Sequence, residues 1–224
     1  MTAEGVGGLT PTTQDYLKAI WSLGEWDASA VTVTALAERL GVRTSTASDG
    51  LRKLSEQGFV QHAPYGAILL TDAGTVHALA MVRRHRLLEA FLQSQLDYSW
   101  DEVHDEAESL EHAVSERFIE RIDALLGHPT RDPHGDVIPP PAGAPPVPTA
   151  VPLSSLADGD VGVVVRISDS SPERLRAFAE AGLVPDVVVA VAVALGARVA
   201  RVGDKSMPLG DADAAAIWVV PRVD

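Results

Sequence analysis

The spacing of apolar residues predicts that the chain begins with helices. In the segment TTQDYLKAIWSLGEWD, apolar side chains recur every three or four positions, as they do on the buried face of a helix. Thr12 or Thr13 is available as the N-cap, because a threonine side chain can accept a hydrogen bond from the first turn. We therefore expect an amphipathic helix that starts near these threonines.

Two shorter helices follow in the pattern. One lies around residues 36–40, with Thr32 or Thr34 near its start, and the other covers residues 44–57 and ends at Gly58. Because only a tight turn separates them, they are typical of a helix-turn-helix, a motif that binds DNA.

A change of period marks the next elements. Residues 59–62 and 67–71 read as two short strands with a turn between them, which predicts a β-hairpin. A hairpin directly after the second short helix indicates the winged form of the helix-turn-helix. The helical period then returns over residues 72–96, where Thr71 or Asp72 can cap the first turn.

A further helix is predicted over residues 99–127, capped near Ser99 or Asp101 and ended by Gly127. The next stretch, residues 128–150, holds 8 of the 15 prolines of the chain. Because proline cannot donate to a helix or a sheet, we expect this stretch to be an extended linker and not a folded element.

The last third of the chain changes to strand-like runs. They read VGVVVRIS, VVVAVAVALG, RVARVG and AIWVV, and one helix, SPERLRAFAEAGL, interrupts them. The expected fold class is therefore a mainly α N-terminal part, with a winged helix-turn-helix and a helical dimerisation domain, followed by a small all-β barrel. The predicted units are listed by residue as 1–73 for the winged helix-turn-helix, 74–140 for the helical domain, 141–150 for the proline-rich linker and 151–224 for the barrel.

Composition narrows the classes of function. The 224 residues include no cysteine, which excludes disulfides, thiolate zinc sites and thiol catalysis. No run of about 18 apolar residues suggests a membrane span, and the N-terminus does not resemble a secretory signal, so we expect a cytoplasmic protein with no membrane partner. The net charge of −13 argues against a nucleic-acid partner, but the charge is uneven along the chain. Residues 101–123 carry nine acidic side chains, whereas residues 43–53 carry three basic side chains and one acidic.

Potential metal ligands gather on two of the predicted helices. The segment VHDEAESLEH supplies His104, Glu108, Glu111 and His112, and the preceding helix carries a histidine and a glutamate four residues apart. Side chains three or four residues apart share a helical face. Carboxylate and imidazole ligands suit manganese or ferrous iron. The alternative is an ordinary solvated acidic face.

Five segments together resemble one protein family. They are TTQDYLKAIW, LAERLGVRTSTASDGLRKLSEQGFV, RRHRLLEAFL, VHDEAESLEH and DPHGDVIP, in the order and spacing of the diphtheria-toxin-repressor family of metal-dependent bacterial repressors. The resemblance covers about residues 10–140, and the C-terminal part looks like the FeoA-type SH3-like barrel of longer members. It implies a homodimer that binds a palindromic DNA operator and controls metal-ion homeostasis.

The resemblance also implies two neighbouring sets of metal ligands. The first is Asp15 with Glu108, Glu111 and His112. The second is His85, Glu89 and His104, completed from the barrel by Asp169 or, as second choice, by Glu173. Iron-type members carry methionine and cysteine where this chain has Asp15 and Glu108. Two carboxylates harden the site, so Mn²⁺ is the expected cofactor, Fe²⁺ is the alternative, and other divalent transition metals are expected to substitute in vitro.

The chain departs from the family pattern at two places. Short manganese repressors have a glutamate where this chain has Lys18, which puts a shared two-metal cluster in doubt. The family motif Cys-Pro-His-Gly reads DPHG from Asp132 to Gly135, so the role of that cysteine is expected to be absent.

A metal held between Asp15 and the other half would fix the angle between the two halves and, in a dimer, the spacing of the two recognition helices.

DNA contacts are expected on the second short helix. The predicted base or phosphate contacts are Arg43, Thr44, Ser45, Thr46, Ser48, Arg52 and Lys53. For Thr44, helix capping is the alternative role. The dimer surface is expected to include Phe118, Ile122 and Leu125, with the intramolecular core as the alternative.

Other classes of function fit less well. The chain lacks the His-x-x-x-His pair of zinc hydrolases, a phosphate loop and a dinucleotide fingerprint, so we expect no enzyme and no organic cofactor. A winged-helix regulator that does not depend on metal stays open as a rival.

Overall fold

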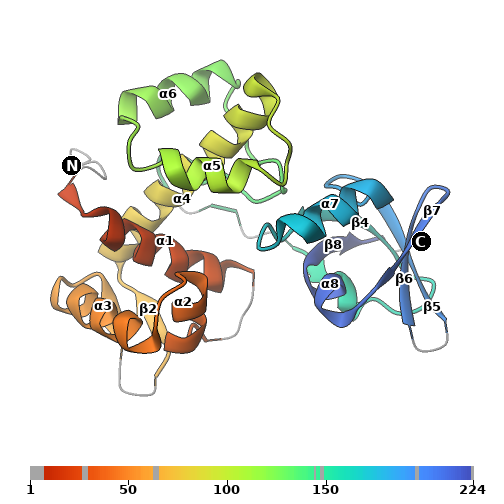
Figure 1. Cartoon of the computed structure of the whole chain (residues 1–224), viewed down its shortest axis with the longest axis horizontal. Helices are drawn as coiled ribbons and strands as arrows, with labels where there is room; N and C mark the ends of the chain where they lie inside the picture. The colour runs from red at the N-terminus through yellow and green to blue at the C-terminus, as the bar shows by residue number, and fades with distance from the viewer. Residues whose placement is uncertain are drawn as a thin grey trace.

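The structure is a computed structural model that describes residues 8–26, 30–62, 66–143, 145–146, 149–194 and 197–222. A helical part and a β-rich part lie side by side along the long axis of the molecule (Figure 1). The helical part contains α1 (Pro11–Glu25), α2 (Val33–Arg39), α3 (Thr44–Glu56), α4 (Asp72–Leu96), α5 (Val103–Leu110) and α6 (Glu116–Leu125), with a wing made of β1 (Val60–His62) and β2 (Ile68–Leu70). None of the described helices is long and apolar enough to span a membrane.

The first three helices and the wing share one hydrophobic core. The core is built from every third or fourth residue of the helices and from one face of each wing strand, including Tyr16, Leu17, Ile20, Leu36, Leu51, Leu54, Val60 and Ile68. The two wing strands pair antiparallel. The predicted winged helix-turn-helix is confirmed, although residues 63–65 of the wing turn lie outside the described residues.

Capping explains where the helices begin. Thr32 caps α2 by accepting a hydrogen bond from the backbone of Ala35, and Thr71 caps α4 by accepting one from Gly74, both at predicted positions. The prediction for α1 was wrong by two residues. Its cap is Thr10, and Pro11 takes the first helical position, where a missing N–H is harmless.

The single helix predicted over residues 99–127 is two helices. A turn over residues 111–115 separates α5 from α6, and Ser115 caps α6 by accepting a hydrogen bond from Phe118. Glu111 and His112 therefore lie just after α5 and not on a continuous helical face. Ile122 of α6 belongs to the core, at 3% exposure, so its assignment to a dimer surface was wrong.

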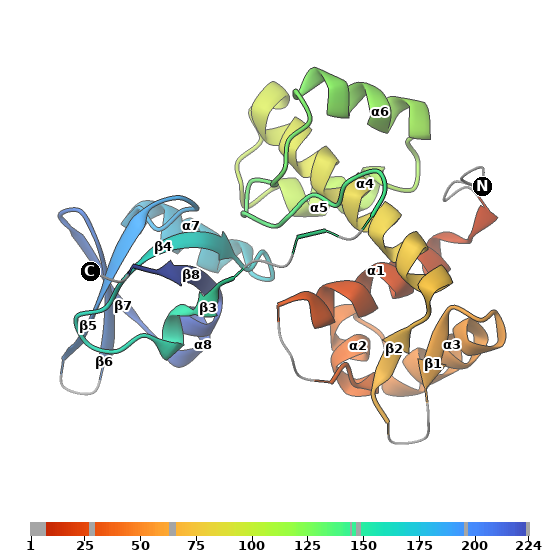
Figure 2. The same ribbon diagram turned by 180° about the vertical axis from the view of Figure 1, so that it is seen from behind.

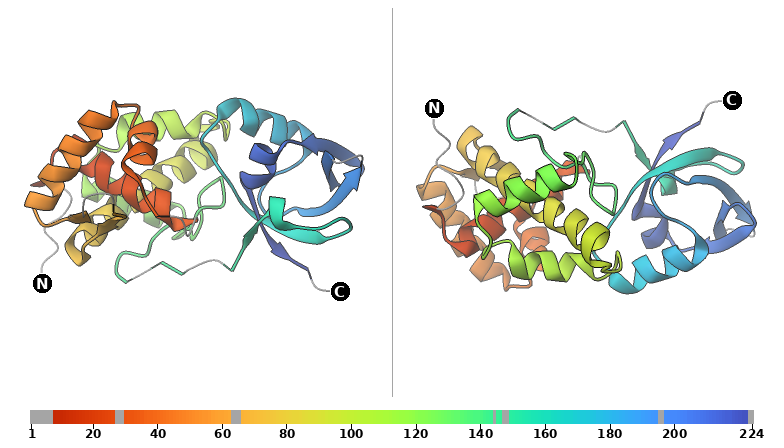
Figure 3. Two further views of the ribbon diagram at one scale, coloured as in Figure 1. Left: turned by 90° about the horizontal axis from the view of Figure 1, so that it is seen from below. Right: turned by 90° about the horizontal axis from the view of Figure 1, so that it is seen from above.

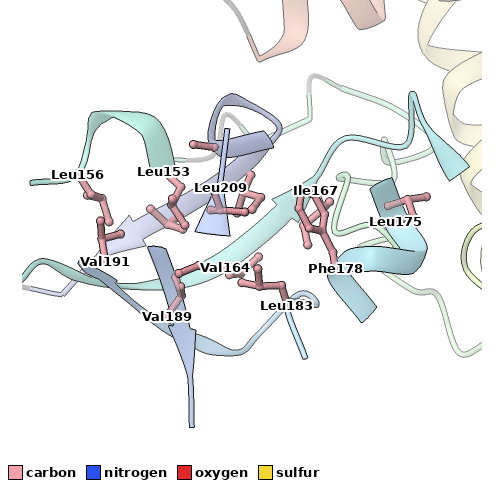
Figure 4. Packing of buried hydrophobic residues seen from close by; sticks show 14 of the residues in the cluster. Leu153, Leu156, Val164, Ile167, Leu175, Phe178, Leu183, Val189, Val191 and Leu209 are labelled. Atoms are coloured by element: carbon pink, nitrogen blue, oxygen red, sulfur yellow. The ribbon is translucent and has the colours of Figure 1, made fainter. Parts of the chain in front are cut away.

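The β-rich part is a six-stranded antiparallel sheet with strand order β3-β8-β4-β5-β6-β7. Its elements are β3 (Val151–Pro152), η2 (Leu153–Ser155), β4 (Val161–Ile167), α7 (Pro172–Ala181), β5 (Val188–Ala194), β6 (Ala197–Val202), β7 (Lys205–Leu209), α8 (Asp211–Ala215) and β8 (Ile217–Pro221). Alternate residues of the strands point into a core that Phe178 of α7 completes (Figure 4). The short elements β3, η2, β7 and α8 were not predicted.

The prediction that residues 128–150 contain no folded element was wrong for their first part. Arg131 and Val137 form an isolated antiparallel bridge, and the turn between them is buried. The backbone carbonyl of His134 accepts a hydrogen bond from the N–H of Ile167 in β4. At Gly135, with φ +91°, a Cβ would stand 2.0 Å from the carbonyl oxygen of Val165, so only glycine fits. In Figures 2 and 3, the described residues after this turn, 138–143, 145–146 and 149–150, form an extended connection to the β-rich part.

Gly50 of α3 provides a test of the packing between α1 and α3. A Cβ at this position would stand 2.4 Å from the ring of Tyr16, whose hydroxyl donates to the carbonyl of Thr46. We expect Gly50→Ala to lower the free energy of unfolding by about 1–3 kcal/mol, because overpacking outweighs the gain in helix propensity.

Gly24 of α1 is the matched control, because a Cβ there meets only Val31 at 3.7 Å. Chemical denaturation of both variants measures the difference. Equal stability of Gly50→Ala and the original chain would contradict the packing described for Tyr16.

Candidate metal centre and DNA-binding surface

Helix α4 carries the middle of a buried cluster of acids and histidines. His85 and Glu89 stand one turn apart on its inner face, with His85 Nε2 at 3.0 Å from Glu89 Oε1. The side chain of Glu89 is 1% exposed. Burial of a carboxylate is unfavourable unless cations or hydrogen bonds compensate it, so the surrounding groups decide its state.

Three side chains contact one nitrogen of His104, which projects from α5. Its Nδ1 lies 3.0 Å from Asp169 Oδ2, 3.2 Å from Glu89 Oε1 and 3.2 Å from His85 Nε2. Asp169 comes from the loop between β4 and α7, so the β-rich part contributes to this group. One ring N–H cannot donate well to three partners at once. The predicted set His85, Glu89, His104 and Asp169 is thus brought together, whereas Glu173 has no contact with it among the described interactions.

A second group joins α1 to the end of α5. His112 Nε2 lies 2.7 Å from Asp15 Oδ1 and 3.5 Å from Glu111 Oε1. Its other nitrogen, Nδ1, is 2.8 Å from the Gln14 side-chain oxygen, which orients the ring. The sequence reasoning missed Gln14. Asp15 is 97 residues from His112 in the chain, so this contact ties the DNA-binding half to the rest of the helical part.

Between these two groups lies a third, made of His85, Glu108 and Glu111. Glu111 is fully buried, and its Oε2 is 2.7 Å from His85 Nδ1. Its Oε1 is 2.5 Å from the ammonium of Lys18, which also lies 2.7 Å from Glu108 Oε1. All eight predicted metal-ligand residues therefore lie within one continuous cluster.

Hydrogen bonds between histidines and carboxylates shift the pKa values of several groups in the cluster. Burial alone would lower the pKa of His104, but hydrogen bonds to Asp169 and Glu89 outweigh it and raise that pKa to about 10. Burial likewise acts to raise the pKa of Glu89, yet His85 and His104 hold that pKa below its usual range. At Asp15 burial prevails over the neighbouring His112 and raises the pKa.

The arrangement fits a divalent cation. A cavity of about 40 Å³ opens at the cluster, and its lining includes His85, Glu89, Glu108 and Asp169. A space of that size admits an ion together with water. One ligand atom from each of His85, Glu89, His104 and Asp169 lies within 4.8 Å of the others, close enough for one cation to contact all four.

Sequence reasoning missed two residues of the cluster. Asp132 and His134 form a further group with Glu89, and all three are buried. His134 Nε2 donates to the carbonyl of Trp100, while its Nδ1 is buried with no hydrogen-bond partner among the described residues. A carboxylate, Asp132, thus stands where the family motif has cysteine, and it lies beside Glu89 and His134. The DPHG motif itself was the available signal.

A second network docks the β-rich part on the end of α1. Asp136 Oδ1 accepts hydrogen bonds from Trp26 Nε1 at 2.6 Å and from Arg166 Nε at 2.8 Å. The Arg166 guanidinium lies over the rings of both Trp26 and Trp218, 5.0 Å and 4.5 Å from their centroids. Arg86 of α4 lies 3.4 Å from the same carboxylate. Helices α1 and α4 and strand β4 therefore meet at one aspartate.

The predicted DNA contacts lie on one exposed surface. Arg43 precedes α3, and Thr44, Ser45, Thr46, Ser48, Arg52 and Lys53 all lie on its exposed side. The N-cap position of α3 is Arg43, whose side chain makes no capping hydrogen bond, so Thr44 is not the cap of this helix. Arg52 pairs with Glu56 at 2.9 Å. The hydroxyl of Ser48 donates to the carbonyl of Thr44.

Three family models match successive parts of the chain. Residues 8–68 match "Iron dependent repressor, N-terminal DNA binding domain", and residues 71–140 match "Iron dependent repressor, metal binding and dimerisation domain". Residues 151–221 match the FeoA domain.

Relatives and solved structures point the same way. The chain is 29% identical over 214 residues to the iron-dependent repressor IdeR of Mycobacterium bovis, covering 85% of this chain and 88% of the relative. It is 32% identical over 119 residues to the HTH-type transcriptional regulator MntR of Oceanobacillus iheyensis, covering 53% and 80%. A solved manganese-dependent transcriptional repressor in complex with manganese superposes with a TM-score of 0.88 at 52% identity, covering 94% of this chain and 100% of that one.

A winged helix-turn-helix joined to a buried cluster of acids and histidines defines a metal-dependent DNA-binding regulator. The chain belongs to the iron-dependent repressor family, in its long form with a C-terminal FeoA domain.

The raised pKa of His104 predicts how stability depends on pH when no metal is bound. Its folded-state pKa of about 10 exceeds the ordinary value of 6.5, so its contribution to stability is fully present below about pH 6.5 and is lost as the pH rises toward 10. We expect the unfolding temperature of chelator-treated protein to fall over this range, and to fall less in His104→Gln. His128→Gln is the control, because the His128 side chain is 72% exposed. An equal fall in His104→Gln and the original chain would refute this role.

Proposed function

We propose that the chain is a manganese-dependent, DNA-binding transcriptional repressor that controls metal-ion homeostasis. The observation that carries the proposal is the contact of Asp15, from the DNA-binding half, with His112 of the other half. A ligand atom of Glu111 lies within 4.8 Å of both. Since one set of potential ligands spans both halves, occupancy of the set and their relative position are linked.

The donor chemistry supports manganese. The proposed ligands are Asp15, Glu108, Glu111 and His112 for one position and His85, Glu89, His104 and Asp169 for the other, with Asp132 and His134 beside the second. A divalent cation bound there supplies the positive charge that the crowded carboxylates lack. Oxygen-rich sets suit Mn²⁺, and the chain offers no thiolate to favour softer metals. Similarity to a manganese-dependent repressor at 52% identity supports the same choice.

The residues of the chain provide the DNA-binding surface and a candidate dimer surface. The polar side of α3, which carries Arg52 and Lys53, faces solvent beside the exposed Arg43, as a recognition helix requires. Phe118 and Leu125 of α6 are 44% and 62% exposed and stand seven residues apart, on one face of the helix. Exposed apolar side chains that gather on one face mark protein interfaces. We propose a homodimer that uses this side of α6 and places two α3 helices on a palindromic operator. In such a dimer the recognition helices stand about 34 Å apart.

The proposal includes a cytoplasmic location and no catalytic activity. It needs no organic cofactor and no membrane partner. An iron-dependent repressor is the second candidate, because relatives at 29% identity are named iron-dependent repressors. A regulator that ignores metal is the remaining alternative.

Selection from a random DNA library tests these candidates together. The full-length protein would select DNA with Mn²⁺, with anaerobic Fe²⁺ and with chelator. We expect a palindrome to be enriched with Mn²⁺ and lost with chelator. Equal enrichment with Fe²⁺ would keep metal dependence but remove the argument for manganese from Asp15 and Glu108. Enrichment that persists in chelator would refute metal dependence.

Asp15→Ala tests the bridge between the halves. We expect Mn²⁺-activated affinity for the selected DNA to fall about 100-fold, because the DNA-binding half loses its carboxylate ligand. Circular dichroism should show an intact fold. The matched control is Asp204→Ala, in an exposed turn after β6. Full activation of Asp15→Ala by Mn²⁺ would show that this bridge is not needed.

A further inference from the structure

A lysine ammonium lies inside the cluster of acids. Lys18 stands one turn after Asp15 on α1, and the residue is only 7% exposed. Its Nζ lies 2.7 Å from Glu108 Oε1 and 2.5 Å from Glu111 Oε1. Buried lysines are rare, and they persist when carboxylates satisfy them, as these two do.

This ammonium lies at the middle one of the three adjoining ligand groups. His85, Glu108 and Glu111 offer ligand atoms within 4.8 Å of one another, a geometry suited to a cation. Lys18 already contacts two of these three residues. Both Glu111 oxygens are engaged, since Oε2 pairs with His85. A cation on the same carboxylates would therefore have to share them with the ammonium or displace it.

The charge of Lys18 opposes a divalent ion on physical grounds. Like charges a few ångströms apart repel, and burial reduces the screening of that repulsion by water and salt. The opposite effect on metal binding would follow if the ammonium held the two carboxylates in the position that a metal needs. The two effects have opposite signs, because removal of the ammonium tightens metal binding in the first case and weakens it in the second.

We propose that Lys18 is a resident cation of the metal centre that sets its metal threshold. When no metal is bound, the ammonium neutralises Glu108 and Glu111 and lets them remain close to His85. When Mn²⁺ is present, the same charge raises the Mn²⁺ concentration that is needed to occupy the metal centre. The inference rests on the proposed metal-binding function, and it adds a residue that is not itself a ligand.

Isothermal titration of full-length protein with Mn²⁺ at fixed pH and ionic strength tests the proposal. Lys18→Gln removes the charge and keeps an amide donor, whereas Lys18→Arg keeps the charge. We expect Lys18→Gln to reach half-saturation at a Mn²⁺ concentration that is lower than in the original chain by a factor of about ten. We expect the half-saturation concentration of Lys18→Arg to stay within about threefold of that of the original chain. The control Lys205→Gln removes an exposed charge of β7, whose ammonium donates to the backbone carbonyl of Glu180, and should leave Mn²⁺ binding unchanged.

A second measurement covers a variant that does not fold without metal. Lys18→Gln would then be purified with Mn²⁺ and dialysed against increasing chelator. Retention of Mn²⁺ to higher chelator concentrations than in the original chain supports the proposal. Unchanged or weaker Mn²⁺ binding by Lys18→Gln, in either measurement, overturns it.

The outcomes separate this inference from the proposed function. If the original chain binds no Mn²⁺ in the titration, the proposed metal-dependent function fails. If the original chain binds Mn²⁺ and Lys18→Gln binds it no more tightly, only the role of Lys18 fails.

Discussion

The buried carboxylate of Glu111 is the interaction on which the helical part depends. It has no exposed surface, and it lies just after α5. Lys18 from α1 and His85 from α4 each contact one of its oxygens. Because an uncompensated buried carboxylate is strongly unfavourable, these contacts favour the arrangement in which the three helices meet. The burial of one acid thus defines how the DNA-binding half sits against the rest.

A second aspartate does the same for the β-rich part. Asp136 receives hydrogen bonds from Trp26 at the end of α1 and from Arg166 of β4, with Arg86 nearby. The turn that carries Asp136 also buries His134 beside Glu89. The position of the β-rich part and the composition of the metal cluster are therefore linked through a few residues of one turn. This explains how Asp169, distant in sequence, reaches His104.

Local rules predicted the parts of the fold that depend on local contacts. Thr32 and Thr71 were identified as helix caps because a cap is decided by neighbours a few residues away. The break at 111–115 was missed, because a helical pattern runs on through it and only the tertiary contacts of Glu111 and the cap at Ser115 show where it ends. The buried turn around His134 was missed for a related reason. Its prolines suggested an exposed linker, whereas its partners lie on strands and helices far away in the chain.

The candidate ligands were named mainly through a resemblance, and their convergence could not have come from spacing alone. Asp15 and His112 are separated by 97 residues, so no helical spacing relates them. Asp132 was not among the predicted ligands, although its carboxylate lies beside Glu89 and His134. Residue identity was thus a better guide than periodicity wherever the contacts are distant.

The central claim is that the cluster joins the DNA-binding half to the second half when metal is bound. Because the chain has no cysteine, Ser55→Cys on α3 and Asp105→Cys on α5 allow clean attachment of two dyes at exposed positions. Single-molecule energy transfer between them measures the distance distribution. The account predicts a narrow distribution in Mn²⁺ and a broader one in chelator. Identical distributions in the two conditions would contradict it.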